Sequence, residues 1–149
     1  MTLWRISNHS SLDGEGGLRA AGRWHSRGRR IVYCTQSPAA ALLEILVHAE
    51  ITLADSPRRY RLLRLWAPEP PRGVSIEPHD LPEDWVRSPL VTRRVGDAWL
   101  SEGGSALLLV PSAVVAETTN VLINPLHPVA AGIDLIAESD HVVDRRLLE

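Results

Sequence analysis

Residues 22–48 read GRWHSRGRRIVYCTQSPAAALLEILVH, and this stretch predicts a strand, a turn and a helix in succession. Arg23, Tyr33 and Glu44 fall within it at spacings of ten and eleven positions. A guanidinium, an aromatic ring and one carboxylate on an otherwise apolar helix are suited to an anionic ligand that contains a ring. The stretch therefore predicts part of the fold and a candidate binding site together.

The helix is predicted from its start signal and its composition. Ser37 is a suitable N-cap, Pro38 suits the first helical position, and residues 39–49 are mostly strong helix formers. The helical period predicts a largely buried helix. Its apolar stripe consists of Leu42, Ile45, Leu46 and Ala49, and its apolar flank consists of Leu43 and Val47. Glu44 and His48 lie one turn apart on the other side, so we expect this carboxylate to face either a cleft or solvent.

The strand before the helix is predicted over residues 30–35, where β-branched and aromatic residues precede a turn. Alternation puts Tyr33 on the same face as Ile31 and opposite Val32 and Cys34. Tyr33 is either a core tyrosine or part of a ligand site. Upstream, Arg23 follows a flexible glycine and either grips a phosphate or pairs with a carboxylate.

The remaining elements favour an α+β fold, a single domain over residues 1–149 with a curved, mixed central β-sheet and flanking helices. Further strands are predicted at 2–7, 59–66, 106–110, 118–123 and 133–137, and a second helix at 88–101 with Pro89 at its start. Residues 8–17 read as a polar, glycine-containing loop, and a loop-rich segment follows Pro68. The run at 106–110 is continuously apolar, which indicates a strand covered on both faces.

Composition limits the classes of function. The net charge of −2 argues against a surface that coats nucleic acid, and the single cysteine, Cys34, fits a reducing, cytoplasmic location. No export signal, membrane span or metal-ligand spacing of histidines is recognisable. All sixteen basic residues are arginine, as in proteins of GC-rich bacterial genomes, so the arginine clusters at 27–30 and 58–59 are read as solvated or partner-facing charge.

A set of ordered motifs spans nearly the whole chain and resembles the RES-domain family, the toxins of bacterial RES–Xre toxin–antitoxin pairs. The motifs are Gly22-Arg23-Trp24, Ile31-Val32-Tyr33-Cys34-Thr35, Ala41-Leu42-Leu43-Glu44, Leu81-Pro82-Glu83-Asp84-Trp85, Gly96-Asp97-Ala98-Trp99, Val110-Pro111-Ser112-Ala113 and Asn124-Pro125-Leu126-His127-Pro128. The resemblance implies a fold similar to the diphtheria-type ADP-ribosyltransferases. It also implies consumption of NAD⁺ as a substrate, with no further cofactor.

The resemblance also implies which residues form the site. The family's arginine, tyrosine and glutamate match Arg23, Tyr33 and Glu44, and Arg5 resembles a second basic position that helps to hold the dinucleotide. Glu44 would stabilise positive charge at the anomeric carbon, and the two arginines would bind the pyrophosphate. Tyr33 would stack on the nicotinamide or the ribose.

Three positions are less settled by the resemblance. The family's serine is assigned to Ser112 as a hydrogen-bond donor in the NAD⁺ site, with Ser105 as the alternative. His25 stands where a smaller polar residue such as asparagine is expected, which bears on the contact with the ribose. Residues 14–17 resemble a dinucleotide-binding glycine motif only weakly and do not predict that type of site. They form either a mobile loop near the pocket or a plain connection.

Three functions therefore stay open. The first is a type II toxin that cleaves the nicotinamide–ribose bond of NAD⁺ as a glycohydrolase or phosphorylase, and the second is a protein mono-ADP-ribosyltransferase that uses the same residues. The third is a non-catalytic or RNA-targeting module. The resemblance implies an Xre-type antitoxin as partner, an oligomeric toxin–antitoxin complex that contacts DNA through the antitoxin, and no membrane association.

Overall fold

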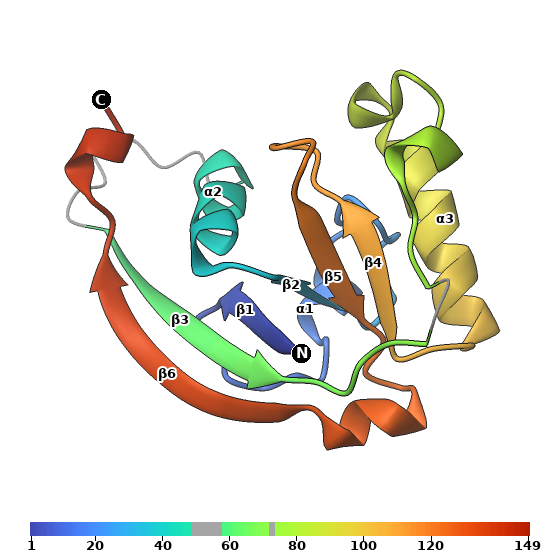
Figure 1. The fold of residues 1–149 in the computed structure, drawn as a ribbon, viewed down its shortest axis with the longest axis horizontal. Helices are drawn as coiled ribbons and strands as arrows, with labels where there is room; N and C mark the ends of the chain where they lie inside the picture. The colour runs from blue at the N-terminus through green and yellow to red at the C-terminus, as the bar shows by residue number, and fades with distance from the viewer. Residues whose placement is uncertain (49–57, 72–73) are drawn as a thin grey trace.

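A computed structural model describes residues 1–48, 58–71 and 74–149 of the chain. Its strands are β1 (Thr2–Ile6), β2 (Val32–Thr35), β3 (Arg59–Trp66), β4 (Leu107–Pro111), β5 (Thr119–Ile123) and β6 (Asp134–Val142). Its helices are α1 (Gly16–Arg19), α2 (Pro38–His48) and α3 (Pro89–Glu102), with short 3₁₀ helices η2 (Pro78–Asp80), η3 (Trp85–Arg87), η4 (Pro128–Gly132) and η5 (Arg145–Leu147). Figure 1 shows a curved sheet with α2 and α3 on separate parts of it.

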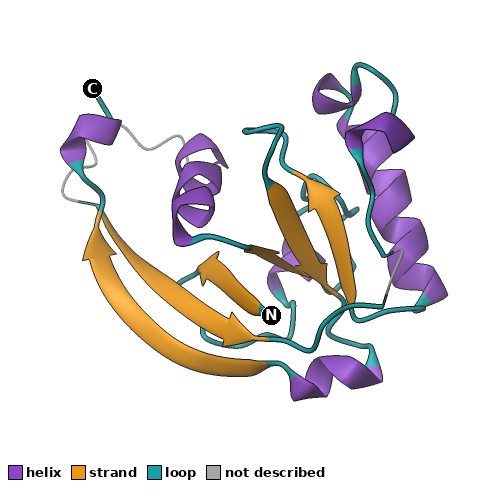
Figure 2. Ribbon diagram, in the orientation of Figure 1, coloured by secondary structure: helices purple, strands orange, loops and turns teal. Residues whose placement is uncertain are grey.

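The six strands form one sheet in the order β4-β5-β2-β1-β3-β6. This confirms the predicted α+β class and the curved central sheet, in which β3 and β6 form a long bent pair (Figure 2). The predicted mixture of parallel and antiparallel pairs is wrong, because every neighbouring pair in the sheet is antiparallel and the one parallel contact is an isolated bridge between Ser75 and Leu109.

The sheet separates two apolar clusters, and alternation along the strands divides side chains between them. Val32 and Cys34 belong to the first cluster with Leu3, Leu63, Leu65, Val121 and Ile123. Ile31 belongs to the second cluster with Trp24, Trp85, Trp99, Leu108 and Leu122, and Tyr33 packs against that cluster. The predicted face of Tyr33 is therefore confirmed. The apolar run at 106–110 also contributes to both clusters, as expected of a strand covered on both faces.

The prediction that the first helix is largely buried is wrong for the described residues. Only Ala40 and Ala41 of α2 are buried, whereas Leu43 and Val47 are 41% and 54% exposed. The helix lies against β1 and β2 through its small residues, and its larger side chains Ile45 and Val47 line an open cavity instead of a core. Residue 49, the last of the predicted stripe, lies outside the described residues.

Most predicted boundaries agree with the structure within two residues, and two segments differ more. The predicted strand at 133–137 continues to Val142 as β6, because β6 pairs with the whole length of β3. The loop predicted at 8–17 runs into α1, a four-residue helix that begins at Gly16. Glycine is a poor helix former, so local propensity gives no signal for α1.

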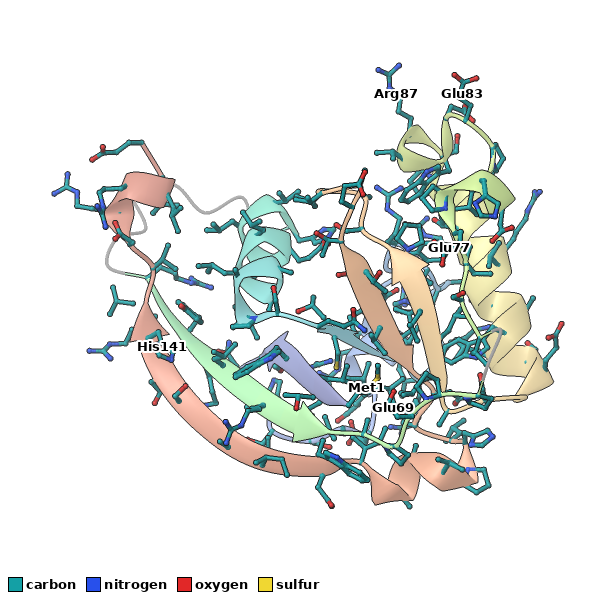
Figure 3. The ribbon with its side chains drawn as sticks, viewed as in Figure 1. Met1, Glu69, Glu77, Glu83, Arg87 and His141 are labelled. Atoms are coloured by element: carbon teal, nitrogen blue, oxygen red, sulfur yellow. The ribbon has the colours of Figure 1, made fainter. Side chains whose placement is uncertain are left out.

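The amino terminus is fixed to the end of β3. The Met1 ammonium donates to the Ala67 carbonyl at 2.6 Å and lies 2.9 Å from the Glu69 carboxylate (Figure 3). These contacts hold β1 in the centre of the sheet, where it carries Arg5. No helix in the described part of the chain is long and apolar enough to cross a membrane.

Candidate functional site

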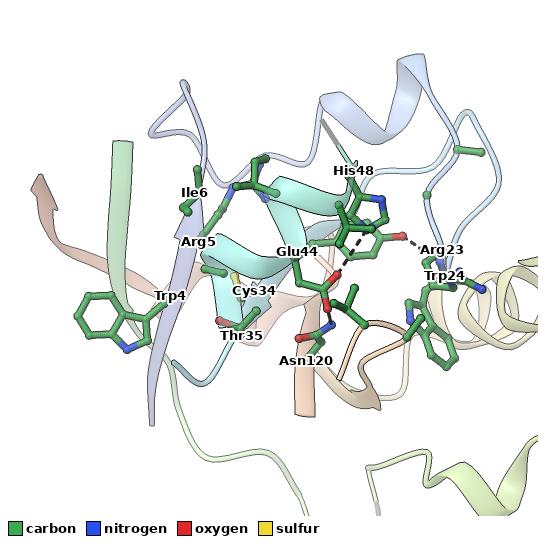
Figure 4. Close-up of a pocket in the computed structure, with 18 residues that line it drawn as sticks. Trp4, Arg5, Ile6, Arg23, Trp24, Cys34, Thr35, Glu44, His48 and Asn120 are labelled. Carbon is green, nitrogen blue, oxygen red and sulfur yellow. Dashed lines mark hydrogen bonds and ion pairs between the residues drawn. The ribbon is translucent and has the colours of Figure 1, made fainter. Parts of the chain in front are cut away.

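Four of the five residues proposed from the sequence lie around one cavity of about 420 Å³: Arg5, Arg23, Tyr33 and Glu44. They come from β1, the loop after α1, β2 and α2, so segments distant in the sequence form its walls (Figure 4). His48 and Asn120 also line the cavity, and Glu44 is the one acidic residue among its described lining residues. A cavity of this size with a few polar groups on apolar walls is typical of a small-molecule site.

Glu44 is held by two neutral donors on one of its oxygens. Oε1 accepts from Ser112 Oγ at 2.7 Å and from Asn120 Nδ2 at 2.8 Å. Oε2 lies 3.4 Å from His48 Nε2, whose side chain is 61% exposed. The predicted one-turn pairing of Glu44 with His48 is thus present, and the carboxylate faces a cavity while only 20% exposed. Its orientation is fixed at Oε1, and Oε2, beside the exposed His48, is the oxygen that can meet a ligand.

Asn120 on β5 was not identified from the sequence. It stands opposite Thr35 of β2 in the sheet, and its Oδ1 is buried without a hydrogen-bond partner among the described residues. Reversing the amide would place Oδ1 against Glu44 Oε1, so the bond to Glu44 sets its orientation. The unsatisfied oxygen is a cost that the fold accepts in order to hold the carboxylate. The sequence gives little signal for this role, because Asn120 simply follows two threonines at the start of the strand predicted over residues 118–123.

Ser112 lies beside Glu44 but not on the cavity wall. The residue is 2% exposed, and its Oγ accepts from the backbone N–H groups of Val114 and Val115 while donating to Glu44. Ser105, the alternative, donates to the Leu107 carbonyl and accepts from Trp99 Nε1, so its hydroxyl is engaged elsewhere. The serine that reaches Glu44 is therefore Ser112, and in this geometry it positions the carboxylate.

The hydroxyl of Tyr33 is occupied by two partners. It accepts from the Trp24 backbone N–H at 3.0 Å and lies 2.7 Å from His25 Nδ1. Because His25 Nε2 faces the Ala20 carbonyl at 2.9 Å, Nε2 carries the proton and neutral Nδ1 accepts from Tyr33. Burial raises the pKa of Tyr33 above its usual range. Tyr33 therefore offers its ring, not an ionisable hydroxyl, to the cavity.

His25 belongs to the support of the site. Its ring is buried, and Nδ1 also accepts from the Gly22 N–H at 3.2 Å. A Cβ at Gly22 would stand 2.5 Å from the Tyr33 hydroxyl and 2.9 Å from His25 Nδ1, so only glycine fits beside this pair. The unexpected histidine is thus a buried link between Tyr33 and the loop at 20–26, which we call the Arg23 loop.

Helix α3 holds the Arg23 loop from the other side. Arg93 Nε donates to the Gly22 carbonyl at 2.8 Å, and Thr92 Oγ1 donates to the Arg23 carbonyl at 2.5 Å. Thr92 is fully buried, and its hydroxyl also contacts the Pro89 carbonyl of its own helix at 3.1 Å. Two successive carbonyls of an irregular segment are therefore satisfied by side chains of one helix.

The Gly96-Asp97 motif explains how α3 approaches so closely. A Cβ at Gly96 would lie 1.7 Å from the Trp24 carbonyl oxygen, which no side chain could tolerate. Asp97 accepts from the Ser26 N–H at 2.9 Å and from the Ser26 hydroxyl at 2.5 Å. The motif thus packs α3 against the backbone of the Arg23 loop and ties down its end.

The two arginines of the cavity lack acidic partners in the described part of the chain. Arg23 donates from Nη1 to the Val86 carbonyl at 2.8 Å, and no carboxylate of the described residues lies within ion-pair distance of it or of Arg5. Arg5 Nε is buried without a partner, and Nη2 lies 3.5 Å from Ser7 Oγ. Burial lowers the pKa of Arg5 from its ordinary value. Both guanidinium groups are therefore available to an anion.

Cys34 also lines the cavity, but its chemistry is that of a core residue. It is buried, and burial raises the pKa of its thiol to about 12. The thiol is therefore protonated at neutral pH and is a poor nucleophile.

Comparison with known proteins identifies the family of this chain. The RES domain family matches residues 2–144. Toxin Res of Pseudomonas putida is 44% identical over 147 residues, which covers 99% of each chain. The Prs ADP-ribosylating toxin of Sphingobium sp. is 34% identical and covers 99% of this chain and 96% of its own. The chain belongs to the RES-domain family.

A solved structure shares the fold. A chain of the M. tuberculosis MbcT–MbcA toxin–antitoxin complex superposes with a TM-score of 0.76, covering 94% of this chain and 83% of its own length at 20% identity. The fold expected from the resemblance is therefore confirmed.

The buried histidine gives a prediction about pH. Burial lowers the pKa of His25 below its ordinary 6.5, so the unfolded chain takes up this proton at a higher pH than the folded chain. Neutral His25 therefore contributes its full stabilisation of the fold above about pH 6.5. This contribution is lost as the pH falls through the pKa of His25 in the folded chain, because protonated Nδ1 could no longer accept from Tyr33 and Gly22. Asp97 lies nearby and opposes the shift, whereas Arg93 adds to it.

We expect urea unfolding between about pH 8 and about pH 5 to show a smaller loss of stability in His25→Asn than in the natural chain. Asparagine keeps an acceptor near the position of Nδ1 but does not titrate. The slope of unfolding free energy against pH should differ between the two proteins by an amount that approaches one proton. Equal slopes would show that folding does not lower the pKa of His25.

Proposed function

We propose that this chain is the toxin of a type II toxin–antitoxin pair and that it consumes NAD⁺ by cleaving the nicotinamide–ribose bond. The observation that carries the proposal is the convergence of Glu44, Tyr33 and two guanidinium groups without acidic partners on one cavity. Two relatives whose names identify them as toxins add support, and one of those names includes ADP-ribosylation. We assign the activity to the cytoplasm, where NAD⁺ is available.

The chemistry follows from the charges in the cavity. When the bond between the anomeric carbon and the nicotinamide nitrogen breaks, its electron pair leaves with nicotinamide and positive charge develops on the ribose. Glu44, fixed through Oε1, would stabilise that charge through Oε2. Arg23 and Arg5 would hold the pyrophosphate, and the ring of Tyr33 would pack against the nicotinamide or the ribose. An acceptor oxygen then bonds to the anomeric carbon and releases its proton.

A protein mono-ADP-ribosyltransferase is the second candidate, favoured by the name of the Sphingobium relative. Both activities need the same residues, and they differ only in the acceptor. A nucleic-acid-binding module is less well supported, because the net charge is −2 and two of the clustered arginines have partners inside the fold. Arg29 lies 3.4 Å from the Asp97 carboxylate, and Arg30 donates to the Asp13 carbonyl at 3.0 Å.

The acceptor is identified by its product. Purified protein should be incubated with NAD⁺ alone, with added phosphate and with cell lysate, and the products identified by mass. We expect release of nicotinamide in all three mixtures, with free ADP-ribose indicating water and its phosphorylated form indicating phosphate as acceptor. A modified lysate protein without free ADP-ribose would select the transferase. Intact NAD⁺ in every mixture would refute the proposed function.

The role of Glu44 is tested by Glu44→Gln. The amide keeps an oxygen acceptor for Ser112 and Asn120 but removes the charge, so we expect the fold to persist and kcat to fall at least about 100-fold. Glu83→Gln is the matched control, because Glu83 is exposed between η2 and η3 and lines neither principal cavity (Figure 3). A folded Glu44→Gln protein with normal turnover would remove Glu44 from the mechanism.

We further propose that an Xre-type antitoxin covers this cavity within an oligomeric complex and that the antitoxin alone contacts DNA. Exposed Val47 and Val86, near Glu44 and Arg23, favour a protein partner, and a carboxylate of that partner would pair with Arg23. The structural relative comes from a toxin–antitoxin complex. NAD⁺ consumption should be low after copurification with the neighbouring gene product and rise when that partner is removed. Unchanged activity would contradict occlusion.

A further inference from the structure

The proposed cleavage of NAD⁺ releases a proton that some group has to take. When an acceptor oxygen that carries hydrogen bonds to the anomeric carbon, its O–H bond has to break, and a side chain within hydrogen-bond reach can accept the proton. The available groups are the ionisable side chains of the cavity that contains Glu44. Among the described residues these are Arg5, Arg23, Tyr33, Cys34, Glu44 and His48.

Five of these six side chains are unsuited to accept the proton. The guanidinium groups of Arg5 and Arg23 already carry theirs. The Tyr33 hydroxyl and the Cys34 thiol keep their own protons at neutral pH, because burial raises both pKa values. Glu44 has to stay ionised while the ribose is positive, since that charge is what it stabilises. Only the imidazole of the cavity is left for this step.

His48 has both the position and the access that the proton transfer needs. It lies one turn after Glu44 on α2 and lines the same cavity, and its Nε2 stands 3.4 Å from Glu44 Oε2 (Figure 4). Its side chain is 61% exposed, whereas that of Glu44 is 20% exposed. The ring therefore joins the inside of the cavity to bulk solvent, and a proton taken on the inner side can leave on the outer side.

The carboxylate of Glu44 also favours a protonated ring at this place. While the anomeric carbon is positive, Oε2 faces that charge. Once the new C–O bond has formed, the ribose is neutral, and the cation beside Oε2 is the imidazolium of His48. One carboxylate thus stabilises two successive cations, and neither charge is left without a partner.

We infer that His48 is a catalytic residue that accepts the proton of the attacking oxygen through Nε2. A lone pair of that oxygen forms the bond to the anomeric carbon, the electron pair of its O–H bond stays on the oxygen, and the proton bonds to Nε2 before it passes to solvent. This inference rests on the proposed function, because that function places the anomeric carbon beside Glu44. It applies to acceptors whose attacking oxygen carries hydrogen, which are water and hydroxyl groups.

His48→Gln removes the proton acceptor and keeps a side chain that can donate to Glu44 Oε2. The fold should persist, because the side chain of His48 is largely exposed. His79→Gln is the matched control. His79 also stands beside a carboxylate, with Nε2 3.6 Å from Asp80, and its side chain is 82% exposed, but it does not line the cavity that contains Glu44.

Azide separates the proton transfer from the rest of the reaction. The azide anion bonds to carbon without a proton to lose, so its attack on the anomeric carbon needs no base. The experiment measures nicotinamide release from NAD⁺ in buffer with and without sodium azide, identifies the products by mass, and checks the fold of each variant by circular dichroism. Where a lysate protein is the acceptor, its modification is measured in place of hydrolysis.

We expect His48→Gln to lower kcat with water or a protein hydroxyl at least about 100-fold, because the ribosyl cation returns to nicotinamide when the acceptor cannot lose its proton. Formation of azido-ADP-ribose should match that of the natural chain. Added imidazole should restore the lost activity in His48→Ala, since it can occupy the space of the missing ring. His79→Gln should match the natural chain in every mixture.

The outcomes separate this inference from the proposed function. Normal turnover by a folded His48→Gln protein would overturn the inference while the function stood. An equal loss of the water and azide reactions would also overturn it, because His48 would then act on Glu44 or on NAD⁺ binding and not on the proton. A natural chain that leaves NAD⁺ intact in every mixture, azide included, would refute the proposed function and the inference with it.

Discussion

The geometry of the cavity depends on the hydrogen bonds that hold the Arg23 loop against α3 and β2. The loop has no regular secondary structure, so its peptide groups need partners from elsewhere in the fold. Thr92 and Arg93 satisfy two carbonyls, and Tyr33 satisfies the Trp24 N–H. The side chain of Arg23 is thereby held at the cavity that contains Glu44. A change on α3 can therefore alter the site without touching a ligand.

Local signals predicted the elements that carry the site. Ser37 and Pro38 mark the start of α2, since Ser37 Oγ accepts from the Ala40 N–H at 3.0 Å as an N-cap should. Alternation along residues 31–35 gave the correct face for Tyr33, because the two sides of the sheet bury different clusters. The family motifs added Arg5 and Ser112, which neither spacing nor periodicity would have selected.

Contacts between distant segments account for what the sequence did not predict. Asn120 reaches Glu44 only because β5 pairs with β2, and no local pattern specifies that neighbour. The exposure of α2 has the same origin, since periodicity reports which residues are apolar but not whether a cavity faces them. The need for glycine at position 96 is explained only by the contact of α3 with the Trp24 backbone, which leaves no room for a Cβ. These are tertiary constraints, and they override local propensity.

The hydrogen bonds of Tyr33 also limit the chemistry that the site can perform. Its hydroxyl is engaged by Trp24 and His25, and burial raises its pKa, so it is not suited to donate a proton to a leaving group. Nicotinamide needs no such acid, because its ring nitrogen becomes neutral as it takes the electron pair. What the proposed cleavage of NAD⁺ requires is a negative group near the anomeric carbon and firm attachment of the phosphates. A fixed carboxylate and two guanidinium groups meet these requirements, which makes cleavage of a cationic leaving group the chemistry that fits this cavity best.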